Sequence, residues 1–440
     1  MISIENVSKN ISGAKPTEKR NGAPVYALSF EYLGGKDVMP IGGWWGPYKP
    51  LNPVCDLTAK RFYEDIKACG VNHITVSRDN YASNPQGVLQ GMDYAEECGL
   101  GMFVHDTTVP KIADVEELKN RLNEYRYKKN CLGFHVFDEP LPNEFDWIQT
   151  YYNNYASLGE SEQCLYTNLY PVYGKTMFEK FDLDYDGYLE EFLKRVPTKF
   201  LSYDYYPFYF KGEGIGGAKK YFGNLSSVRK AAKKYKIPFW VFLQAGGQWQ
   251  CVNKPSIENY PNREEMFWNM HTCMAYGAKA FQYFTLIQPE EYTKTDVGVD
   301  YRRIGLIGFD GEKNEWYPIA KEINEHIAFV DEVMMNAENL GVIPVGEYAK
   351  DWVCEEEKLS SFRELLSVDG KQAIVGCFDY LGKTALYIAN ASTTENAEIT
   401  LHFDCERAFT VYKNEEKEIY SSKSPKMKFS AGEGLLIVLD

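Results

Sequence analysis

Eight times along the chain, a short apolar run is followed by a longer amphipathic run. The apolar runs are nearly continuous and rich in β-branched and aromatic residues, which is typical of parallel strands covered on both faces. Several of the amphipathic runs end in glycine, as helices commonly do. The predicted strands fall within residues 37–47, 71–77, 100–106, 131–140, 164–171, 199–208, 238–247 and 279–289. Eight strand-then-helix units are the number that closes a parallel (β/α)8 barrel.

An open doubly wound sheet is the competing architecture, but no GxGxxG follows the first predicted strand, and such a sheet needs no count of eight. From about residue 340 the pattern changes to short alternating runs separated by Gly, Asn and Asp, which predicts a β-sandwich. We therefore expect an α/β fold in which a leader over 1–36 packs on a (β/α)8 TIM barrel over 37–338, followed by a C-terminal β-sandwich domain over 339–440. The sandwich is expected to support the barrel and is compatible with a homo-oligomer.

Charge and cysteine content exclude several classes of protein. The net charge of −14 repels phosphate backbones and anionic lipid surfaces, so we expect no nucleic-acid partner and no membrane partner. None of the 10 cysteines belongs to a CxxC pair and most lie in apolar runs, so we expect reduced core residues and no cofactor. The first residues lack the basic-then-apolar pattern of a secretory signal, which favours the cytoplasm, although a secreted chain without its signal would look the same.

Barrel enzymes carry their chemistry on the loops that follow the strands, so the residues that end each predicted strand are the candidates. Acids and amides there accompany aromatic rings, as in sites that cleave sugars: a glycosidic bond needs a carboxylic acid to protonate the leaving oxygen, and rings bind the sugar's C–H face. The predicted catalytic residues are Asp138, Glu139 and Asp204. The predicted substrate-binding residues are Trp44, Trp45, Arg78, His105, Asn168, Tyr170, Tyr206, Gln244, Trp249, Tyr283 and Gln288.

The stretch FHVFDEP, residues 134–140, ends an apolar strand in two adjacent acids. Partial burial and the charge of Asp138 would both raise the pKa of Glu139 and keep it protonated near neutral pH, which suits a proton donor. The competing interpretation is a carboxylate that answers the dipole of the next helix, but it does not explain the adjoining aspartate. His135 shares strand parity with Glu139, so we expect it to point inward beneath the acid. His73, His105 and His135 follow strand spacing rather than a ligand motif, so we expect no metal site.

FDEP resembles the Asn-Glu-Pro of clan A retaining glycosidases, in which the glutamate is the acid/base. The segment GLIGFDGEKNEWYPIAKEIN, residues 305–324, is similar to the closing stretch of such barrels, including family 42-like β-galactosidases, and AGEGLLIVL to their C-terminal modules. Two positions depart from clan A: Gln244 stands where the nucleophilic glutamate is expected, and Asp138 stands in place of asparagine. An amide cannot attack as a carboxylate does.

These departures make the chain resemble the β-N-acetylhexosaminidases and β-N-acetylgalactosaminidases that carry an Asp-Glu pair after strand four. That resemblance implies a retaining, substrate-assisted reaction on a glycoside or oligosaccharide with a 2-acetamido sugar, in which the acetamido oxygen attacks the anomeric carbon. Glu139 would be the acid/base, Asp138 would hold the acetamido nitrogen, and the tyrosine that holds the acetamido carbonyl would be Tyr170, Tyr206 or Tyr283.

Two other hypotheses stay open. A glycosidase acting on a neutral sugar would use Asp204 or Glu290 as its second carboxylate, and a separation of about 6.5–9.5 Å between Asp204 and Glu139 would favour inversion. The other hypothesis is a catalytically inactive barrel that only binds carbohydrate. In that case Gln244 stands where a catalytic nucleophile has been lost.

Overall fold

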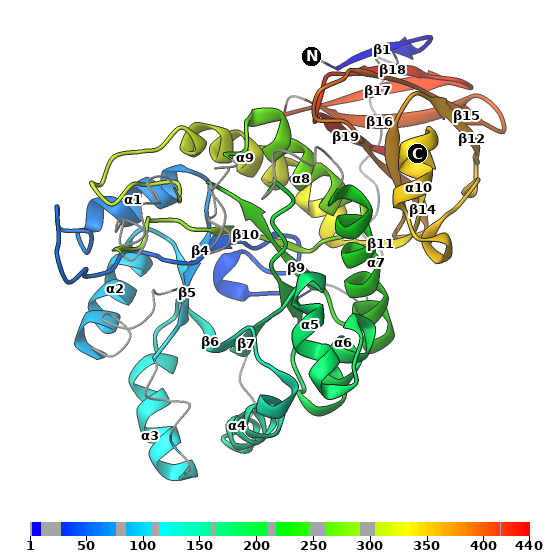
Figure 1. The fold of residues 1–440 in the computed structure, drawn as a ribbon. Coiled ribbons are helices and arrows are strands. Elements are labelled where there is room, and N and C mark those ends of the chain that lie inside the picture. The colour runs from blue at the N-terminus through cyan, green and yellow to red at the C-terminus, as the bar shows by residue number, and fades with distance from the viewer. Residues whose placement is uncertain are drawn as a thin grey trace, which may run out of the picture.

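The structure is a computed structural model of the chain, and it describes residues 2–9, 28–75, 85–106, 112, 114–159, 163–208, 217–246, 260–290, 304–413 and 415–440. The described part contains one eight-stranded parallel sheet and two antiparallel sheets, which confirms the predicted barrel and sandwich (Figure 1). Within these residues, no helix is both long and apolar enough to cross a membrane.

The parallel sheet forms the barrel wall. Its strands are β3 (Ile41–Gly43), β4 (His73–Thr75), β5 (Gly101–Val104), β6 (Cys131–Asp138), β7 (Cys164–Leu169), β8 (Leu201–Tyr203), β9 (Phe239–Gln244) and β10 (Ala280–Phe284). From β4 to β10 each strand pairs with the next one in sequence, and β10 also pairs with β3. Strands β3 and β4 meet where Asn72 N donates to Ile41 O at 2.8 Å and Gly46 N donates to Thr75 O at 3.1 Å, so the wall closes on itself.

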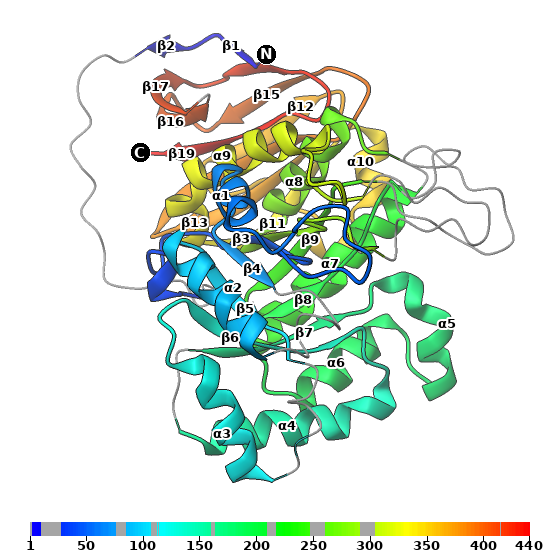
Figure 2. The same cartoon turned by 90° about the vertical axis from the view of Figure 1, so that its left-hand side faces the viewer.

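Helices surround this wall on the outside, as both views show (Figure 2). They are α1 (Lys60–Ala68), α2 (Pro85–Glu97), α3 (Val115–Arg126), α4 (Phe145–Ser157), α5 (Lys175–Phe178), α6 (Tyr185–Arg195), α7 (Ala218–Tyr235), α8 (Arg263–Ala275) and α9 (Trp316–Met335). Short 3-10 turns are η1 (Glu31–Leu33), η3 (Pro142–Glu144), η4 (Val172–Gly174), η5 (Glu179–Phe181) and η8 (Glu355–Glu357). The helices cover the apolar outer faces of the strands, which is why the strand sequences lack alternation.

The C-terminal part is a β-sandwich with its own apolar core. Its strands are β11 (Ala337–Val345), β12 (Leu365–Gly370), β13 (Ala373–Tyr380), β14 (Lys383–Asn390), β15 (Ala397–Phe403), β16 (Arg407–Lys413), β17 (Glu416–Ser422), β18 (Lys426–Phe429) and β19 (Gly434–Leu439), and the helix α10 (Glu347–Trp352) follows β11. With β1 (Ser3–Glu5) and β2 (Ser8–Lys9) from the start of the chain, one sheet has the order β1-β18-β15-β12 and the other β11-β13-β14-β19-β16-β17-β2.

The first residues of the chain do not pack on the barrel as we expected. Strand β1 (Ser3–Glu5) pairs antiparallel with β18, and β2 (Ser8–Lys9) pairs with β17, so the N-terminus completes both sheets of the sandwich. Of the described leader residues, those at the end of the segment meet the barrel, where Phe30 is buried against Phe103 and Trp240 at ring distances of 6.0 and 6.1 Å. The prediction was wrong for 3–9 because unpaired sheet edges 400 residues away offered these residues hydrogen bonds that local sequence does not reveal.

Helix α8 joins the two parts. Residues 266–275 of this helix are all buried, because α8 lies between the barrel wall and the sandwich. At this contact the hydroxyl of Tyr387 on β14 lies 2.8 Å from His271 Nδ1 and 2.8 Å from His326 Nε2. Burial lowers the pKa of both imidazoles, so the contact is between neutral groups.

Candidate active site

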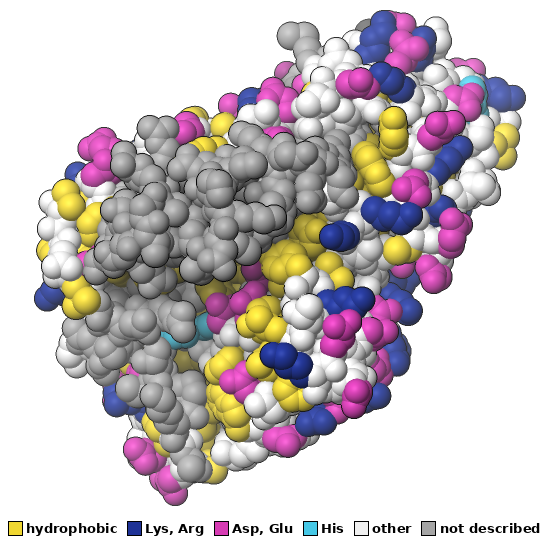
Figure 3. Space-filling view, viewed as in Figure 1, with side chains coloured by type: hydrophobic (Ala, Val, Ile, Leu, Met, Phe, Trp, Pro, Cys, Tyr) yellow, Lys and Arg dark blue, Asp and Glu magenta, His cyan; other side chains and the backbone are white. Residues whose placement is uncertain are grey.

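The acids predicted from the sequence gather at the carboxyl ends of the barrel strands. Asp138 ends β6, Glu139 follows it, Asn168 lies in β7 and Asp204 follows β8. The view onto this end shows acidic and histidine side chains between hydrophobic ones near the centre of the face (Figure 3). This is the end at which barrel enzymes hold their substrates.

Two backbone irregularities let adjacent acids face the same site. The pairing of β6 with β7 shifts by one residue between His135 and Phe137, so Asp138 stands opposite Asn168. Such a bulge reverses the strand parity, and our expectation that Glu139 shares the parity of His135 was therefore wrong. Glu139 instead has a left-handed φ of 51°, a conformation that bulky residues avoid and that is often found at functional sites.

Asn168 links two of the acids. Its Nδ2 donates to Asp204 Oδ1 at 2.7 Å and to Asp138 Oδ1 at 3.3 Å. Asn168 is only 2% exposed, so its amide is shielded from water and depends on these protein partners for its hydrogen bonds. The amide thus holds the carboxylates of β6 and β8 close together.

Burial and neighbouring charges shift the pKa values of two of the acids. Burial raises the pKa of Glu139, and the charges of Asp204 and then Asp138 raise it further. Burial also raises the pKa of Asp204, as does Asp138, while hydrogen bonds from Asn168 and Tyr206 oppose the rise. The raised pKa favours the protonated form of the Glu139 carboxyl near neutral pH, which is the form that a proton donor needs.

Burial of the Asp204 carboxyl also lowers the stability of the fold at pH values where that carboxyl is ionised. We expect Asp204→Asn to raise the free energy of unfolding at pH 8 by about 1 kcal/mol or more, the worth of one pKa unit. A carboxyl with a raised folded-state pKa contributes stability that is complete below its unfolded pKa and is lost as the pH rises through the folded pKa. Asparagine does not ionise, so the variant does not lose this stability as the pH rises. Urea unfolding at pH 8 and near pH 4 should show a gain that shrinks at the lower pH, and an equal gain at both would contradict this account.

Several aromatic and imidazole rings meet at this end of the barrel. Trp44, which follows β3, packs edge-on against His135 at 4.7 Å and against Phe284 at 6.5 Å between ring centroids. His135 stacks on His105 at 4.6 Å. The ring of Tyr206 lies 6.0 Å from that of Phe284. These rings come from five different strands or their loops, so the predicted aromatic residues of the barrel mouth meet in space.

Other candidates lie around the same mouth. Burial raises the pKa of Tyr170 to about 12, with Glu139 as the largest charged contributor, which places Tyr170 beside the proposed acid. Trp45 packs edge-on against Tyr48 at 5.6 Å, and the Tyr48 hydroxyl donates to the backbone oxygen of Gln288 at 3.1 Å. Trp45 and Gln288 thus share the side of the mouth formed by β3 and β10. Arg78 and Trp249 lie outside the described residues.

Three predicted polar residues have structural partners. Tyr283 points outward and donates to Asn324 Oδ1 of α9 at 2.7 Å, so its prediction as a substrate-binding residue was wrong. Gln244 is 2% exposed, and its amide accepts from Phe208 N at 3.1 Å and donates to Gly246 O at 3.2 Å. Glu290 accepts from the backbone nitrogen of Leu51 at 2.6 Å and braces that loop.

Sequence reasoning missed three residues beneath the acids: Tyr166, Ser202 and Gln282, which are completely buried yet hydrogen-bonded to one another. Each lies two residues before an inward-facing position at its strand end, so inward parity was the signal that could have identified them. His73 lies lower, 5.6 Å from the ring of Trp240. Within the described ranges, no group of three or more His, Cys, Asp or Glu side chains could hold a metal ion.

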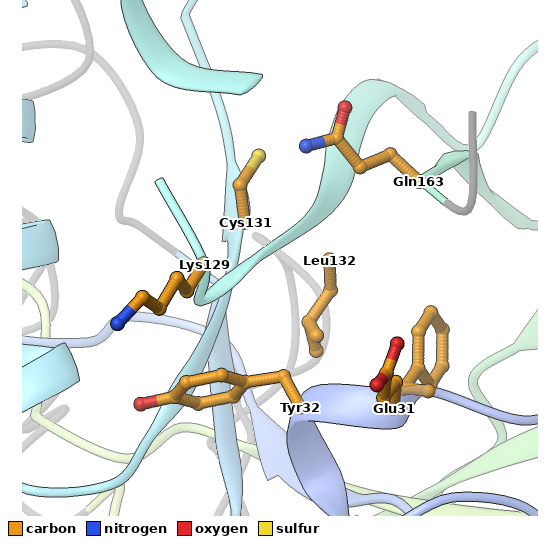
Figure 4. Close-up of a pocket in the computed structure, with 7 residues that line it drawn as sticks. Glu31, Tyr32, Lys129, Cys131, Leu132 and Gln163 are labelled. Atoms are coloured by element: carbon orange, nitrogen blue, oxygen red, sulfur yellow. The ribbon is translucent and has the colours of Figure 1, made fainter. Parts of the chain in front are cut away.

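A separate cavity of about 420 Å³ lies at the opposite, amino end of the barrel (Figure 4). It is lined by Phe30, Glu31, Tyr32, Lys129, Cys131, Leu132 and Gln163. The hydroxyl of Tyr32 donates to Glu96 O and the amide of Gln163 donates to Arg126 O, and in Figure 4 the polar ends of its side chains point in different directions. The acids at the carboxyl end are therefore the better candidate site.

Neither a protein-family profile nor a curated protein sequence matches the chain. Solved structures do match. One described as a glycoside hydrolase has a TM-score of 0.54 and 13% identity, over 92% of this chain and 93% of its own. Another, the noncanonic maltogenic alpha-amylase AmyB from Thermotoga neapolitana, has a TM-score of 0.51 and 13% identity, over 92% of this chain and 99% of its own. At this identity the likeness concerns the fold alone: a (β/α)8 barrel followed by a β-sandwich.

Proposed function

We propose that the protein is a glycoside hydrolase in which Glu139 is the general acid. The observation that carries the proposal is the Glu139 carboxyl at the barrel mouth, whose pKa is raised by burial and by two neighbouring acids. A protonated carboxyl at neutral pH can donate to the glycosidic oxygen as the bond breaks. The names of the solved structures with the same fold, a glycoside hydrolase and an amylase, are consistent with this chemistry.

For the second catalytic group, we propose the 2-acetamido oxygen of the substrate itself. Asp138 is exposed and accepts from Asn168, and a carboxylate can accept a further hydrogen bond, such as one from an acetamido N–H. Gln244, at the end of β9, supplies no carboxylate, and its amide is occupied by backbone groups. The acetamido oxygen would attack the anomeric carbon as Glu139 protonates the leaving oxygen, and Glu139 would then activate the water that opens the intermediate.

One observation favours a second candidate, a glycosidase that uses Asp204 on a sugar without an acetamido group. The charge of Asp204 raises the pKa of Glu139 more than that of Asp138 does, so the two carboxyls lie within strong electrostatic reach. A pair of carboxyls in that relation is the usual machinery of hydrolysis by direct attack or by an activated water.

The experiment that separates these candidates measures hydrolysis of nitrophenyl N-acetylhexosaminides and of the matching nitrophenyl hexosides. Substrate assistance predicts turnover of the acetamido sugars only, retention of configuration by proton NMR, and loss of most activity in Asp138→Asn. Turnover of plain hexosides, with azide rescuing Asp204→Gly, would instead identify Asp204 as the second group. Sugar binding without turnover of any substrate would overturn the proposed hydrolase.

A further inference from the structure

Beneath the acids, the barrel interior holds a continuous row of hydrogen-bonded side chains from four strands or their ends. The distances are 3.0 Å from Trp44 Nε1 to Tyr166 Oη, 2.9 Å from Tyr166 Oη to Gln282 Oε1, 3.3 Å from Gln282 Nε2 to Ser202 Oγ, and 2.9 Å from Ser202 Oγ to Asn168 Oδ1. We call this row, Trp44, Tyr166, Gln282, Ser202 and Asn168, the donor chain. It ends at the amide that bridges Asp138 and Asp204.

We infer that the donor chain runs in one direction only and fixes the Asn168 amide with its nitrogen toward the two aspartates. The inference rests on the proposed function, because it makes Tyr166, Gln282 and Ser202 positioning residues for the reaction of those acids. None of the three reaches the mouth of the barrel, since all are completely buried.

The direction follows from which atoms can donate. When Asp138 and Asp204 are ionised, their carboxylates only accept, so Asn168 turns Nδ2 toward them and Oδ1 toward Ser202. Ser202 Oγ lies 2.9 Å from Asn168 Oδ1 and 3.3 Å from Tyr166 Oη, and its one proton goes to the nearer oxygen, that of Asn168. Ser202 therefore accepts from Gln282 Nε2. Gln282 in turn accepts the proton of Tyr166 through Oε1.

At the far end, the oxygen of Tyr166 has already donated its proton and can only accept. Trp44 Nε1 is a donor with no acceptor capacity, and it lies 3.0 Å from that oxygen. Trp44 at one end of the donor chain and the carboxylates at the other therefore require hydrogen bonds that all point the same way. Each of these hydrogen bonds polarises the next one. Trp44 thus supports the acids from below, in addition to presenting its ring at the mouth.

Breaking the chain frees the amide to turn over. If Ser202 no longer donates to it, Asn168 Oδ1 loses its partner, and the flipped amide places an oxygen against the carboxylates. The partial negative charge of the amide oxygen then repels the ionised carboxylates, and their pKa values rise. The rise in the pKa of the carboxylates should be largest when the broken hydrogen bond is next to Asn168, and smaller when it is further along the donor chain.

The test uses Ser202→Ala and Tyr166→Phe, with Tyr152→Phe as the matched control. Tyr152 is also a buried tyrosine, and its hydroxyl lies 3.1 Å from Thr167 Oγ1 on the other face of β7. We expect the acidic limb of the kcat/KM profile to move up by about half a pH unit or more in Ser202→Ala, by less in Tyr166→Phe, and not in Tyr152→Phe. Infrared titration of the buried carboxyl band, identified by its loss in Asp204→Asn, should move in the same order without any substrate.

The infrared readout keeps this inference distinct from the proposed function. A shifted carboxyl titration in a protein without turnover would support the donor chain and overturn the hydrolase. Turnover with an unshifted profile and an unshifted carboxyl band in Ser202→Ala would overturn the donor chain and leave the hydrolase standing. A shift of equal size in Tyr152→Phe would show a general effect of lost stability and would also overturn the inference.

Discussion

Glu139→Gln should lower kcat for a substrate with a poor leaving group by about 10²–10⁴-fold, the usual worth of general acid catalysis. Glutamine keeps the size of the side chain but cannot release a proton to the glycosidic oxygen. The loss should be much smaller for a dinitrophenyl glycoside, whose leaving group needs no proton. Initial rates on the two substrates measure the difference, and the same loss on both would contradict the role of Glu139 as acid.

The control is Glu144→Gln, five residues along the chain. Glu144 accepts from Leu141 N at 2.8 Å in the turn after the acids, and glutamine can accept the same hydrogen bond. Its kcat should stay near that of the unmodified protein. The pH profile gives an independent check: activity that needs protonated Glu139 is lost as the pH rises through its raised pKa, and this alkaline limb should vanish in Glu139→Gln.

Arg229→Met should lower the free energy of unfolding by about 3–5 kcal/mol, the usual cost of removing one partner from a buried ion pair. Arg229, on α7, pairs with Glu357 on η8, and both are under one tenth exposed. Its guanidinium also donates to the side-chain and backbone oxygens of Asn339 at 2.7 and 3.1 Å. In the Arg229→Met variant, the Glu357 carboxylate stays buried but has lost its guanidinium partner. Denaturant unfolding followed by circular dichroism measures the loss.

Lys230→Met is the matched control, because Lys230 is the next residue of the same helix and forms an exposed pair with Asp186 at 3.4 Å. It should change the free energy of unfolding by about 0.5 kcal/mol or less. The double variant Arg229→Met with Glu357→Gln should recover part of the loss, because it no longer buries an unpaired charge. Equal losses in Arg229→Met and Lys230→Met would show that the buried pair contributes nothing to the attachment of the sandwich to α7.

The barrel could be predicted from the sequence because each strand can be recognised from its own residues and their immediate neighbours. FWVFLQ of β9 and AFQYF of β10 are short apolar runs bounded by Pro238 and Gly277, and neither needs a distant partner to be recognised. The acids at the end of β6 were found in the same way, since FHVFDEP shows where a buried strand stops. Tyr283 was misplaced because the pleat of β10 turns it away from the side of Gln282, and its hydroxyl donates to Asn324 of α9, 41 residues away in the chain.

The sequence by itself determined the eight strand-and-helix units and the strand end that carries Asp138 and Glu139, because hydrophobic periodicity and turn residues act within a few positions of the chain. Only the tertiary structure decided how the acids are arranged and what surrounds them. The bulge in β6 exists through its pairing with β7, and the left-handed Glu139 follows it. The bridge of Asn168 to Asp204 joins different strands. Burial and charge at that junction, rather than the identity of any one residue, raise the pKa of Glu139.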